Sequence, residues 1–343
     1  MRRIAALVAL VALAVLAVAW WAVTEPARRA LEPLPVDQPG VIVVETGDGV
    51  SRLTMQLAAR GLIDSSRATR WWLRRHATVT GMDKRMHAGE FRLLPGDTFD
   101  SLLNRIVDGD VISYQLTIID GWTVSQLLSA LAASRLRQTD GLTADTLVAR
   151  LSLSTPNAEG WFLPDTYRYV ATDTDVGLLS RAHLAMRTEL DRQWSRRAPE
   201  LPYQTPYDAL IVASLVEKES GIAEERPLIA SVFVERLRRG MRLQTDPSVI
   251  YGLGAAFDGN LTRRHLELPT PYNTYTMTGL PPTPIALPGK AALSAAMQPA
   301  PARYLYFVGR GDGTSEFSRT LAEHNKAVNR YQRRPARQSG GQR

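Results

Sequence analysis

The fold is decided by residues 205–254, TPYDALIVASLVEKESGIAEERPLIASVFVERLRRGMRLQTDPSVIYGLG. Thr205 is a good helix N-cap, Pro206 suits the first helical position, and Asp208 comes close to completing a capping box. The run that follows, 209–216, is almost wholly apolar. It therefore predicts a helix that is buried on most of its sides.

Two carboxylates, Glu217 and Glu219, lie near the end of this predicted helix, which Gly221 is expected to terminate in a left-handed conformation. Residues two apart point to roughly opposite sides of a helix, so the pair is not expected to line one cleft. Glu219 lies over Leu215 and other apolar side chains, whereas Glu217 lies over smaller and more polar ones. Burial and the helix dipole both favour a protonated Glu219, which is what a general acid needs. The alternative is a solvated glutamate without a catalytic role.

A Pro- and Gly-rich stretch, 269–289, predicts a shaped loop without regular structure. Within it Tyr272, Asn273 and Tyr275 carry the hydroxyl, amide and aromatic groups that suit a sugar subsite. Strand-like residues on either side of 309–313 predict a hairpin close to the end of the chain.

The composition bounds the class of protein. The chain has 343 residues, 45% of them hydrophobic, which is enough for two or three domains with real cores. There is no cysteine, so disulfides, thiolate nucleophiles and cysteine metal sites are excluded. The formal charge of +7 suits an anionic partner.

The motifs of several enzyme classes are absent. The five histidines form no metal-ligand spacing, and the sequence contains no H-E-x-x-H, no G-x-S-x-G elbow and no P-loop. No metal and no cofactor are therefore expected. What remains is carboxylate chemistry in a groove lined by aromatic and amide groups, and cleavage of a glycosidic bond fits that best.

The N-terminus predicts a membrane anchor. Residues 4–23 form a continuous apolar run of about the length that spans a bilayer. Arg2 and Arg3 precede it and favour a cytoplasmic N-terminus. A cleaved signal peptide is the alternative, because residues 17–19 read Ala-Val-Ala. Both interpretations place the body of the protein outside the cytoplasm, so nucleic acid is not expected as a partner.

A weak repeat follows the N-terminal segment. Each copy consists of a strand, a glycine-containing turn and a helix with a small polar cap, and the strands are at 42–45, 91–94 and 116–119. The first two copies are similar to LysM modules, which bind the glycan chains of cell walls. An ordinary small α+β domain is the alternative interpretation.

The predicted fold is α+β, with a transmembrane helix, a LysM-like module and a catalytic domain whose acid lies near the end of a buried helix. The predicted parts are a cytoplasmic N-terminus and anchor (1–23), a linker (24–40), the LysM-like module (41–112), a connecting α+β region (113–200), the catalytic domain (201–332) and a disordered basic tail (333–343).

Several long motifs occur in a characteristic order. They are EGWFLPDTY at 159–167, VEKES at 216–220, RLRRGMRLQTDPSVIYGLG at 236–254, PYNTYTMTGLPP at 271–282, and YLYFV and HNKAV near the end. On these motifs the chain resembles the YceG-like family of endolytic murein transglycosylases. Glu235 and Thr270 depart from the family pattern, where Asn and Ser are frequent.

The resemblance implies a single-pass inner-membrane enzyme with its catalytic domain in the periplasm. It would cut nascent peptidoglycan strands between N-acetylmuramic acid and N-acetylglucosamine and leave 1,6-anhydro-muramic ends. The family's catalytic residue falls on Glu219, which agrees with the helix-face argument. Peptidoglycan strands, the inner membrane (through 4–23) and penicillin-binding wall synthases are the implied partners. The candidates for holding the sugar are Gln244, Thr245, Asp246, Tyr272, Asn273 and Tyr275, although Asp246 would equally serve as a turn residue.

Our hypothesis is that Glu219 acts first as acid and then as base, with the muramic C6 hydroxyl as nucleophile. A muramidase that uses water is one alternative, and it would need a second carboxylate from Glu217, Asp246 or Glu159. A membrane-tethered scaffold that binds glycan without catalysis is another.

Overall fold

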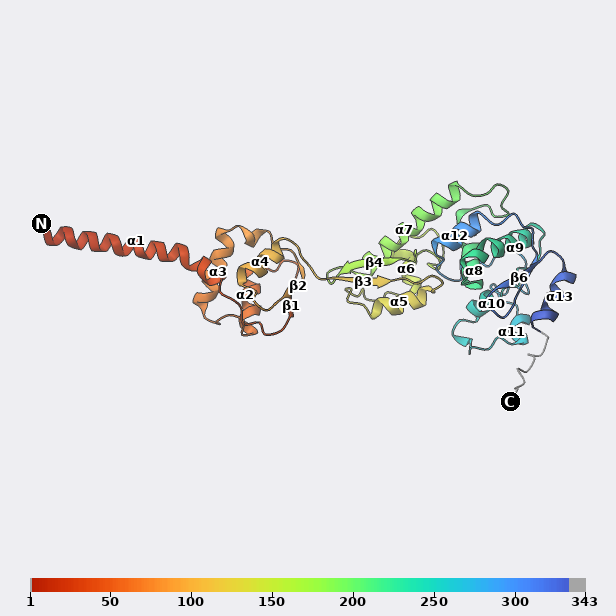
Figure 1. Cartoon of the computed structure of the whole chain (residues 1–343), viewed down its shortest axis with the longest axis horizontal. Helices are drawn as coiled ribbons and strands as arrows, with labels where there is room; N and C mark the ends of the chain where they lie inside the picture. The colour runs from red at the N-terminus through yellow and green to blue at the C-terminus, as the bar shows by residue number, and fades with distance from the viewer. Residues whose placement is uncertain (1, 333–343) are drawn as a thin grey trace, which may run out of the picture. The chain divides into compact units, whose positions relative to one another are not determined.

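The computed structural model describes residues 2–332, and the predicted tail at 333–343 lies outside the described residues. The chain forms two compact units (Figure 1). The first runs to Tyr114 and includes the short returns 135–137 and 168–173, and the second contains the rest. The mixture of helices and strands confirms the α+β class. The predicted connecting region at 113–200 belongs for the most part to the same compact unit as the catalytic region.

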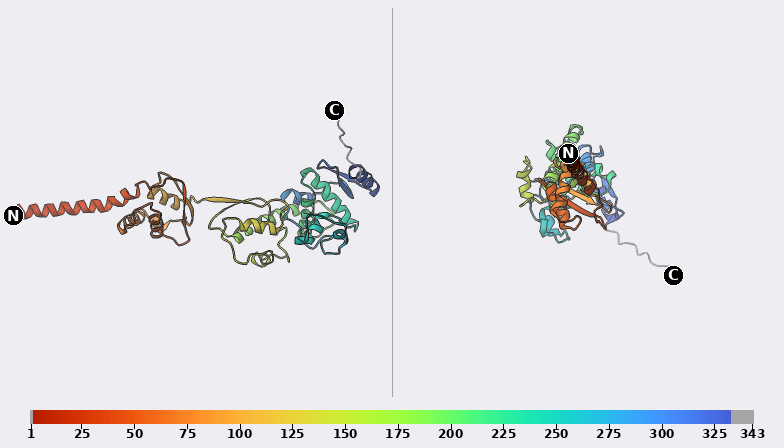
Figure 2. Two further views of the ribbon diagram at one scale, coloured as in Figure 1. Left: turned by 90° about the horizontal axis from the view of Figure 1, so that it is seen from below. Right: turned by 90° about the vertical axis from the view of Figure 1, so that its left-hand side faces the viewer.

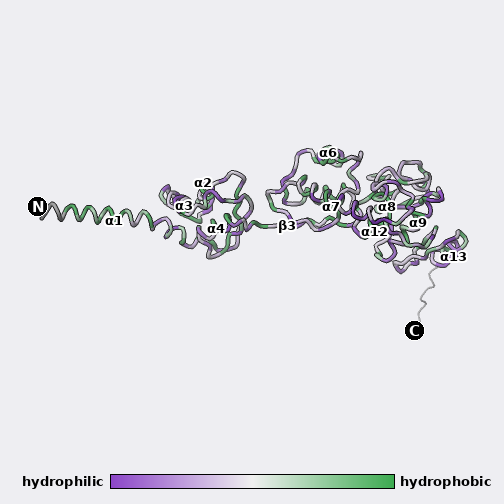
Figure 3. Tube along the Cα trace, turned by 90° about the horizontal axis from the view of Figure 1, so that it is seen from above, coloured by the Kyte–Doolittle hydropathy of each residue, from purple (hydrophilic) through white to green (hydrophobic). Residues whose placement is uncertain are grey.

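The N-terminal helix α1 (Arg2–Ala30) is hydrophobic along most of its length (Figure 3). Its segment Leu7–Ala30 is long and apolar enough to cross a membrane, and none of its most apolar window is buried within the protein. The helix continues into the predicted linker at 24–40, and Ala30 and Leu34 are buried in the core of the first unit. Apolar contacts therefore fix part of the segment that was predicted as a linker to the first unit.

The first unit is a two-stranded sheet with helices packed against it. Strand β1 (Gly40–Val44) pairs antiparallel with β2 (Gly89–Leu93), so that Ile42 lies opposite Phe91, and both side chains are buried. The helices are α2 (Val50–Ala59), α3 (Arg67–Val79), the 3-10 turn η1 (Met82–Lys84) and α4 (Phe99–Val107). The first two strand–turn–helix copies are thus confirmed.

The third copy of the repeat begins at Ser113, just before the first unit ends, and continues into the second unit. Strand β3 (Ser113–Thr117) precedes α5 (Val124–Ala132) and pairs with β4 (Thr166–Val170). Thr123 forms a capping box with Gln126 at the start of α5, which is the small polar cap that the sequence predicts. The short helix α6 (Ala144–Arg150) and the long helix α7 (Asp175–Ser195) complete this region.

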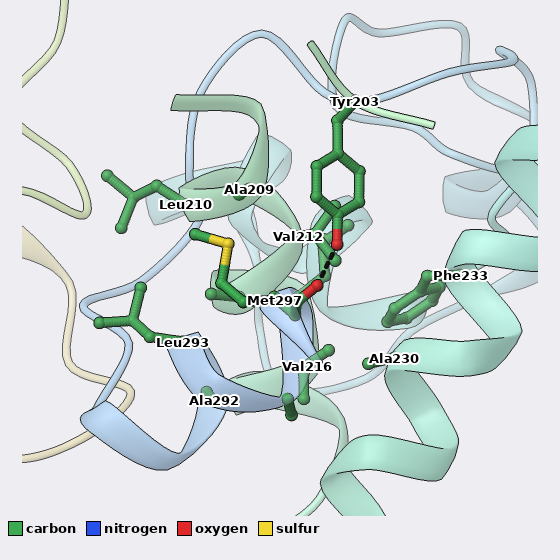
Figure 4. Close-up of a cluster of buried hydrophobic side chains, with 14 of the residues drawn as sticks. Tyr203, Ala209, Leu210, Val212, Val216, Ala230, Phe233, Ala292, Leu293 and Met297 are labelled. Atoms are coloured by element: carbon green, nitrogen blue, oxygen red, sulfur yellow. Dashed lines mark hydrogen bonds between the residues drawn. The ribbon is translucent and has the colours of Figure 1, made fainter. Parts of the chain in front are cut away.

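The core of the second unit surrounds α8 (Pro206–Glu219), which packs against α9 (Arg226–Arg238) and α12 (Lys290–Met297). Figure 4 shows this cluster, in which the Tyr203 hydroxyl donates a hydrogen bond to the Ala296 carbonyl. Every residue of 209–216 is buried, as predicted.

The ends of α8 compare differently with the prediction. Thr205 and Asp208 form the expected capping box. At the other end the helix stops in an extended Ser220, and Gly221 is not left-handed, so its predicted role as a left-handed cap was wrong.

The remaining elements follow α9 in the chain, apart from the turn η2, which directly precedes it. They are α10 (Asp246–Leu253), α11 (Arg263–Glu267), the hairpin of β5 (Tyr306–Gly309) and β6 (Ser315–Ser318), α13 (Leu321–Tyr331), and the 3-10 turns η2 (Ala223–Glu225) and η3 (Gly254–Ala256). The predicted hairpin is confirmed, and α13 packs beside it (Figure 2). The stretch 269–289 contains no helix or strand, as predicted.

One glycine of the aromatic motif is required by its surroundings. Gly160 has a φ of +85°, and an added Cβ would lie 2.6 Å from the Pro284 Cγ. Gly160→Ala should therefore lower the free energy of unfolding by about 2–3 kcal/mol, measured by urea denaturation. Gly221→Ala is the control, because its Cβ would meet nothing within 4 Å. Equal losses in the two variants would contradict this account of Gly160.

Candidate active site

A cleft of about 520 Å³ lies in the second unit at the end of α8. Its lining comes from five parts of the chain that are far apart in sequence: the end of α8, α9 with the loop after it, the 269–289 loop, the β5 strand and α13. The lining residues are Glu219, Arg236, Gln244, Asp246, Tyr275, Tyr306, Phe307, Val308, Gly309, Leu321, His324, Asn325, Val328 and Gln332. The predicted acid and three other predicted positions are thus brought to one cleft or its edge.

Glu219, the last residue of α8, places its carboxyl in this cleft. The Thr245 hydroxyl donates a hydrogen bond to its Oε1. Burial, with a smaller contribution from the negative charge of Asp246, raises the pKa of Glu219 to about 7, against the lowering effects of Thr245 and Arg236. The carboxyl therefore keeps its proton in a large fraction of molecules at neutral pH.

Thr245 is held in place by backbone contacts to the 269–289 loop. The Gln244 amide donates to the Thr274 carbonyl at 3.1 Å, and the Thr245 amide donates to the Thr274 hydroxyl at 3.0 Å. Gln244 has a φ of +52°, a left-handed conformation that is uncommon for a residue with a side chain. This turn directs the Gln244 side chain to the cleft and leaves Thr245 buried beside Glu219.

Arg236 connects two of the segments that surround the cleft through hydrogen bonds to backbone carbonyls. Its Nε donates to the Leu305 carbonyl at 2.7 Å, and its Nη1 donates to the Leu243 carbonyl at 2.6 Å. Burial lowers the pKa of the Arg236 guanidinium. The positive charge of Arg236 in turn lowers the pKa of Glu219. The sequence analysis did not assign it to the site. The sequence does contain a signal that Arg236 faces the protein interior, because it continues the apolar stripe of Ile229 and Phe233 at helical spacing.

Asp246 and Tyr275 form a polar pair at the cleft. The Tyr275 hydroxyl donates to the Asp246 Oδ1 at 2.5 Å, and both residues line the cavity. Asp246 is also the first residue of α10, so it begins a helix rather than a turn. Asp246 is exposed to solvent. Together with Glu219 it gives the cleft lining two carboxyl groups.

Two predicted subsite residues do not line the cleft. Asn273 is 0% exposed, and its amide nitrogen donates to three backbone carbonyls, the shortest bond being 2.6 Å to Leu268. The Tyr272 hydroxyl lies 2.9 Å from that of Thr283. Asn273 therefore ties the 269–289 loop to the end of α11, and Tyr272 forms its contact within the loop.

The two remaining carboxylates have internal partners. Glu217 forms an ion pair with Arg226 at 2.9 Å and accepts a hydrogen bond from the Gly289 amide at 2.9 Å. Its side chain is 4% exposed, so it is sheltered from solvent even though it lies over the smaller and more polar side chains of the helix. The prediction that Glu217 and Glu219 do not share a cleft agrees with the lining of this cavity.

Glu159 is buried at the start of α5. It accepts hydrogen bonds from the Val124 amide at 3.0 Å and from the Tyr251 hydroxyl at 3.2 Å. Burial raises its pKa to about 7. It does not line the cleft, so its position indicates a link between α5 and α10 rather than contact with a substrate.

The far wall of the cleft comes from β5 and α13, whose residues the sequence analysis placed in motifs but gave no role. Tyr306 and His324 stack with ring centroids 5.1 Å apart, and Arg236 lies 5.3 Å from the Tyr306 ring. Burial lowers the pKa of His324. These residues reach the cleft because the chain returns to α9 at β5. No local sequence pattern predicts that return.

The family model described as the YceG-like family matches residues 42–330. The chain therefore belongs to the YceG-like family.

Relatives of known name agree with this membership. An endolytic murein transglycosylase of Bacillus subtilis is 29% identical over 89% of this chain and 88% of its own length. One of Streptococcus pneumoniae is 26% identical over 71% of this chain, which spans half of that longer protein. A crystal structure of a YceG-like protein from Listeria monocytogenes has a TM-score of 0.52 and 26% identity, and it covers 85% of this chain and 99% of that chain.

Two neighbours should shift the pKa of Glu219 in opposite directions. Thr245→Val removes a hydrogen bond that lowers this pKa, and Asp246→Asn removes a charge that raises it. We expect changes of about one unit, upward and downward respectively, because the carboxyl is buried. Carboxyl carbon NMR titration of ¹³C-glutamate protein measures them, with the resonance assigned by Glu219→Gln. Shifts of the same sign would contradict these electrostatics.

Glu219 should also make stability depend on pH. Its folded pKa of about 7 lies above the model-compound value of 4.5, so its contribution to stability is lost as pH rises from about 4.5 to 7. Glu219→Gln cannot titrate and should gain about 2–3 kcal/mol over wild type between pH 5 and pH 8. Urea denaturation of both proteins in detergent measures this gain. Glu159 titrates in both and cancels, and a constant difference across pH would contradict the raised pKa.

Proposed function

We propose that this protein is a lytic murein transglycosylase that cuts peptidoglycan strands within the chain, with Glu219 as its acid and base. One observation carries the proposal: the Glu219 carboxyl lies in an open cleft with a pKa of about 7. Membership of the YceG-like family and relatives named endolytic murein transglycosylase support the same activity.

In the first step Glu219 gives its proton to the glycosidic oxygen, and the bond from that oxygen to the muramic anomeric carbon breaks. Positive charge develops at the anomeric carbon. The muramic C6 hydroxyl then attacks that carbon, and its proton returns to Glu219. The products are one strand with a 1,6-anhydro-muramic end and one with a new hydroxyl. No water is consumed, and Glu219 ends as it began.

The surroundings of Glu219 suit both steps. A pKa near 7 lets one carboxyl donate and accept a proton with little cost in either direction. The Thr245 hydroxyl holds the Oε1 atom, which leaves Oε2 to face the substrate. Asp246 and Tyr275 provide negative charge and a phenol at the same cleft, which suits stabilisation of a cationic anomeric centre.

A muramidase is the second candidate, and the position of Asp246 is what favours it. Of the carboxylates considered as partners of Glu219, only Asp246 lines the cleft. A water activated there would give a reducing muramic end instead of an anhydro end. The Tyr275 hydroxyl already occupies the Asp246 Oδ1 atom with a hydrogen bond, so we prefer the transglycosylase.

The other parts of the chain receive roles on the same proposal. Helix α1 would anchor the protein in the inner membrane, with the catalytic unit in the periplasm, where penicillin-binding synthases work. The first unit, with its two strands and the helices α2 and α3 between them, would act as the LysM-like module that binds glycan. Gln244 and Tyr275 would contact the sugar directly, since both line the cleft.

Replacement of Glu219 by Gln should abolish cleavage, because the amide can neither give nor take the proton. The full chain in detergent is incubated with uncrosslinked glycan strands, and the products are read by mass spectrometry. We expect anhydro ends from wild type and a loss of at least about 1,000-fold in the variant. Glu224→Gln is the matched control, because Glu224 is exposed and lies outside the cleft lining.

Each of the other outcomes would contradict a different part of this proposal. Reducing ends would make it a muramidase, with Asp246→Asn as the next variant. Anhydro ends that persist in Glu219→Gln would move the acid elsewhere. Strand binding without any cleavage by wild type would leave a glycan-binding scaffold.

A further inference from the structure

Helix α3 of the first unit has a basic face that the proposed catalysis does not use. Its inward side chains recur at helical spacing and are buried: Thr69, Trp72, Leu73, His76 and Ala77. Its outward side chains include Arg67, Arg70, Arg74 and Arg75, together with a half-exposed Trp71. In the described part of the chain no carboxylate forms an ion pair with any of these four arginines. A cluster of unpaired cations with an exposed aromatic residue calls for an anionic partner.

Three of these arginines line a cavity of about 300 Å³ between α2 and α3. The cavity is lined by Arg67, Arg70 and Arg74 from α3 and by Ser51, Thr54 and Met55 from α2. The Arg74 Nη1 lies 3.4 Å from the Ser51 hydroxyl. Guanidinium and hydroxyl donors around one hollow match the oxygens of a phosphate group, which accept several charge-assisted hydrogen bonds at once.

The position of α3 beside α1 identifies the source of the phosphate. Trp72 of α3 packs edge-on against Trp21 of α1, with ring centroids 4.9 Å apart, and Trp71 packs on Trp72 at 4.5 Å. If residues 4–23 span the hydrocarbon layer, Trp21 lies about 25 Å along the helix from residue 4, near the outer interface. Tryptophans prefer this depth. The contact therefore holds α3 at the level of the lipid headgroups.

We propose that the basic face of α3 docks on the outer surface of the inner membrane and that the Arg67, Arg70 and Arg74 cavity binds the phosphate of an anionic phospholipid. The inference rests on the proposed membrane anchor, and not on the proposed chemistry at Glu219. Charge complementarity with a phosphate and continuity with the apolar helix α1 favour lipid over glycan as the occupant, because the contact with α1 keeps the three arginines next to the membrane. The docked face would fix the orientation of the first unit on the membrane.

The test uses the full chain in vesicles and exploits its lack of cysteine. A single Ala68→Cys on the exposed side of α3 carries an environment-sensitive fluorophore, and Val41→Cys on β1 is the control position. The quencher is a doxyl group close to the lipid headgroup. We expect stronger quenching at position 68 in phosphatidylglycerol than in phosphatidylcholine, and no such difference at position 41.

Charge variants in the Ala68→Cys background test the arginines themselves. Loss of about fivefold in surface affinity for each arginine predicts a roughly 100-fold fall in the docked-to-undocked ratio for Arg67→Gln/Arg70→Gln/Arg74→Gln. Removal of three charges from the second unit, by Arg187→Gln/Arg263→Gln/Arg264→Gln, should leave the quenching unchanged. Equal effects of the two triple variants would overturn the proposal, because net charge alone would then explain the binding.

Flotation of the vesicles after alkaline extraction tests the membrane anchor separately from the docking surface. A chain that floats but shows equal quenching in both lipids overturns the docking surface alone. A chain that no longer floats overturns the anchor and the docking surface with it. Reversal of the quenching by soluble glycan strands would assign the arginines to glycan and overturn the lipid assignment.

Discussion

The candidate site depends on one constraint, the desolvation of a carboxyl at the end of a helix in which every residue from 209 to 216 is buried. Because α8 packs against α9 and α12, its last residue is fixed where water is scarce. Burial is the largest influence on the pKa of Glu219, and the neighbouring charges only adjust it. A carboxyl with its proton retained near pH 7 follows from packing in the core, and not from a dedicated partner.

Glu217 differs from Glu219 in the partners of its carboxyl. Both side chains are sheltered, and they are two residues apart on one helix. Glu217 faces Arg226 and a backbone amide, which stabilise a carboxylate and give it a structural role. Glu219 forms no ion pair in the described part of the chain and receives one hydroxyl. The same residue type therefore serves structure at one position and candidate chemistry two residues later, on another side of the helix.

The two units combine similar supersecondary elements with different surroundings. Strand, turn and capped helix recur from β1 to α5, yet the first unit joins these pieces to a membrane-type helix and a basic face, and the second joins them to a closed apolar core. Arg236 shows how the second unit closes: a buried guanidinium ties the loop after α9 to the approach to β5. A cation replaces apolar packing there because its donors satisfy backbone carbonyls that would otherwise be buried without partners.

Local pattern was enough to predict several elements of this protein and to select Glu219 as the candidate acid. Apolar periodicity, capping residues and turn glycines predicted α8, the strand–turn–helix copies and the β5–β6 hairpin, because these signals act over a few residues. Helix geometry also separated Glu219 from Glu217. Only the tertiary structure decided the rest: it buried Asn273 in its own loop and brought Arg236, Tyr306 and His324 to the cleft. Contacts between residues tens of positions apart depend on how helices pack, and no short-range pattern in the sequence encodes that packing.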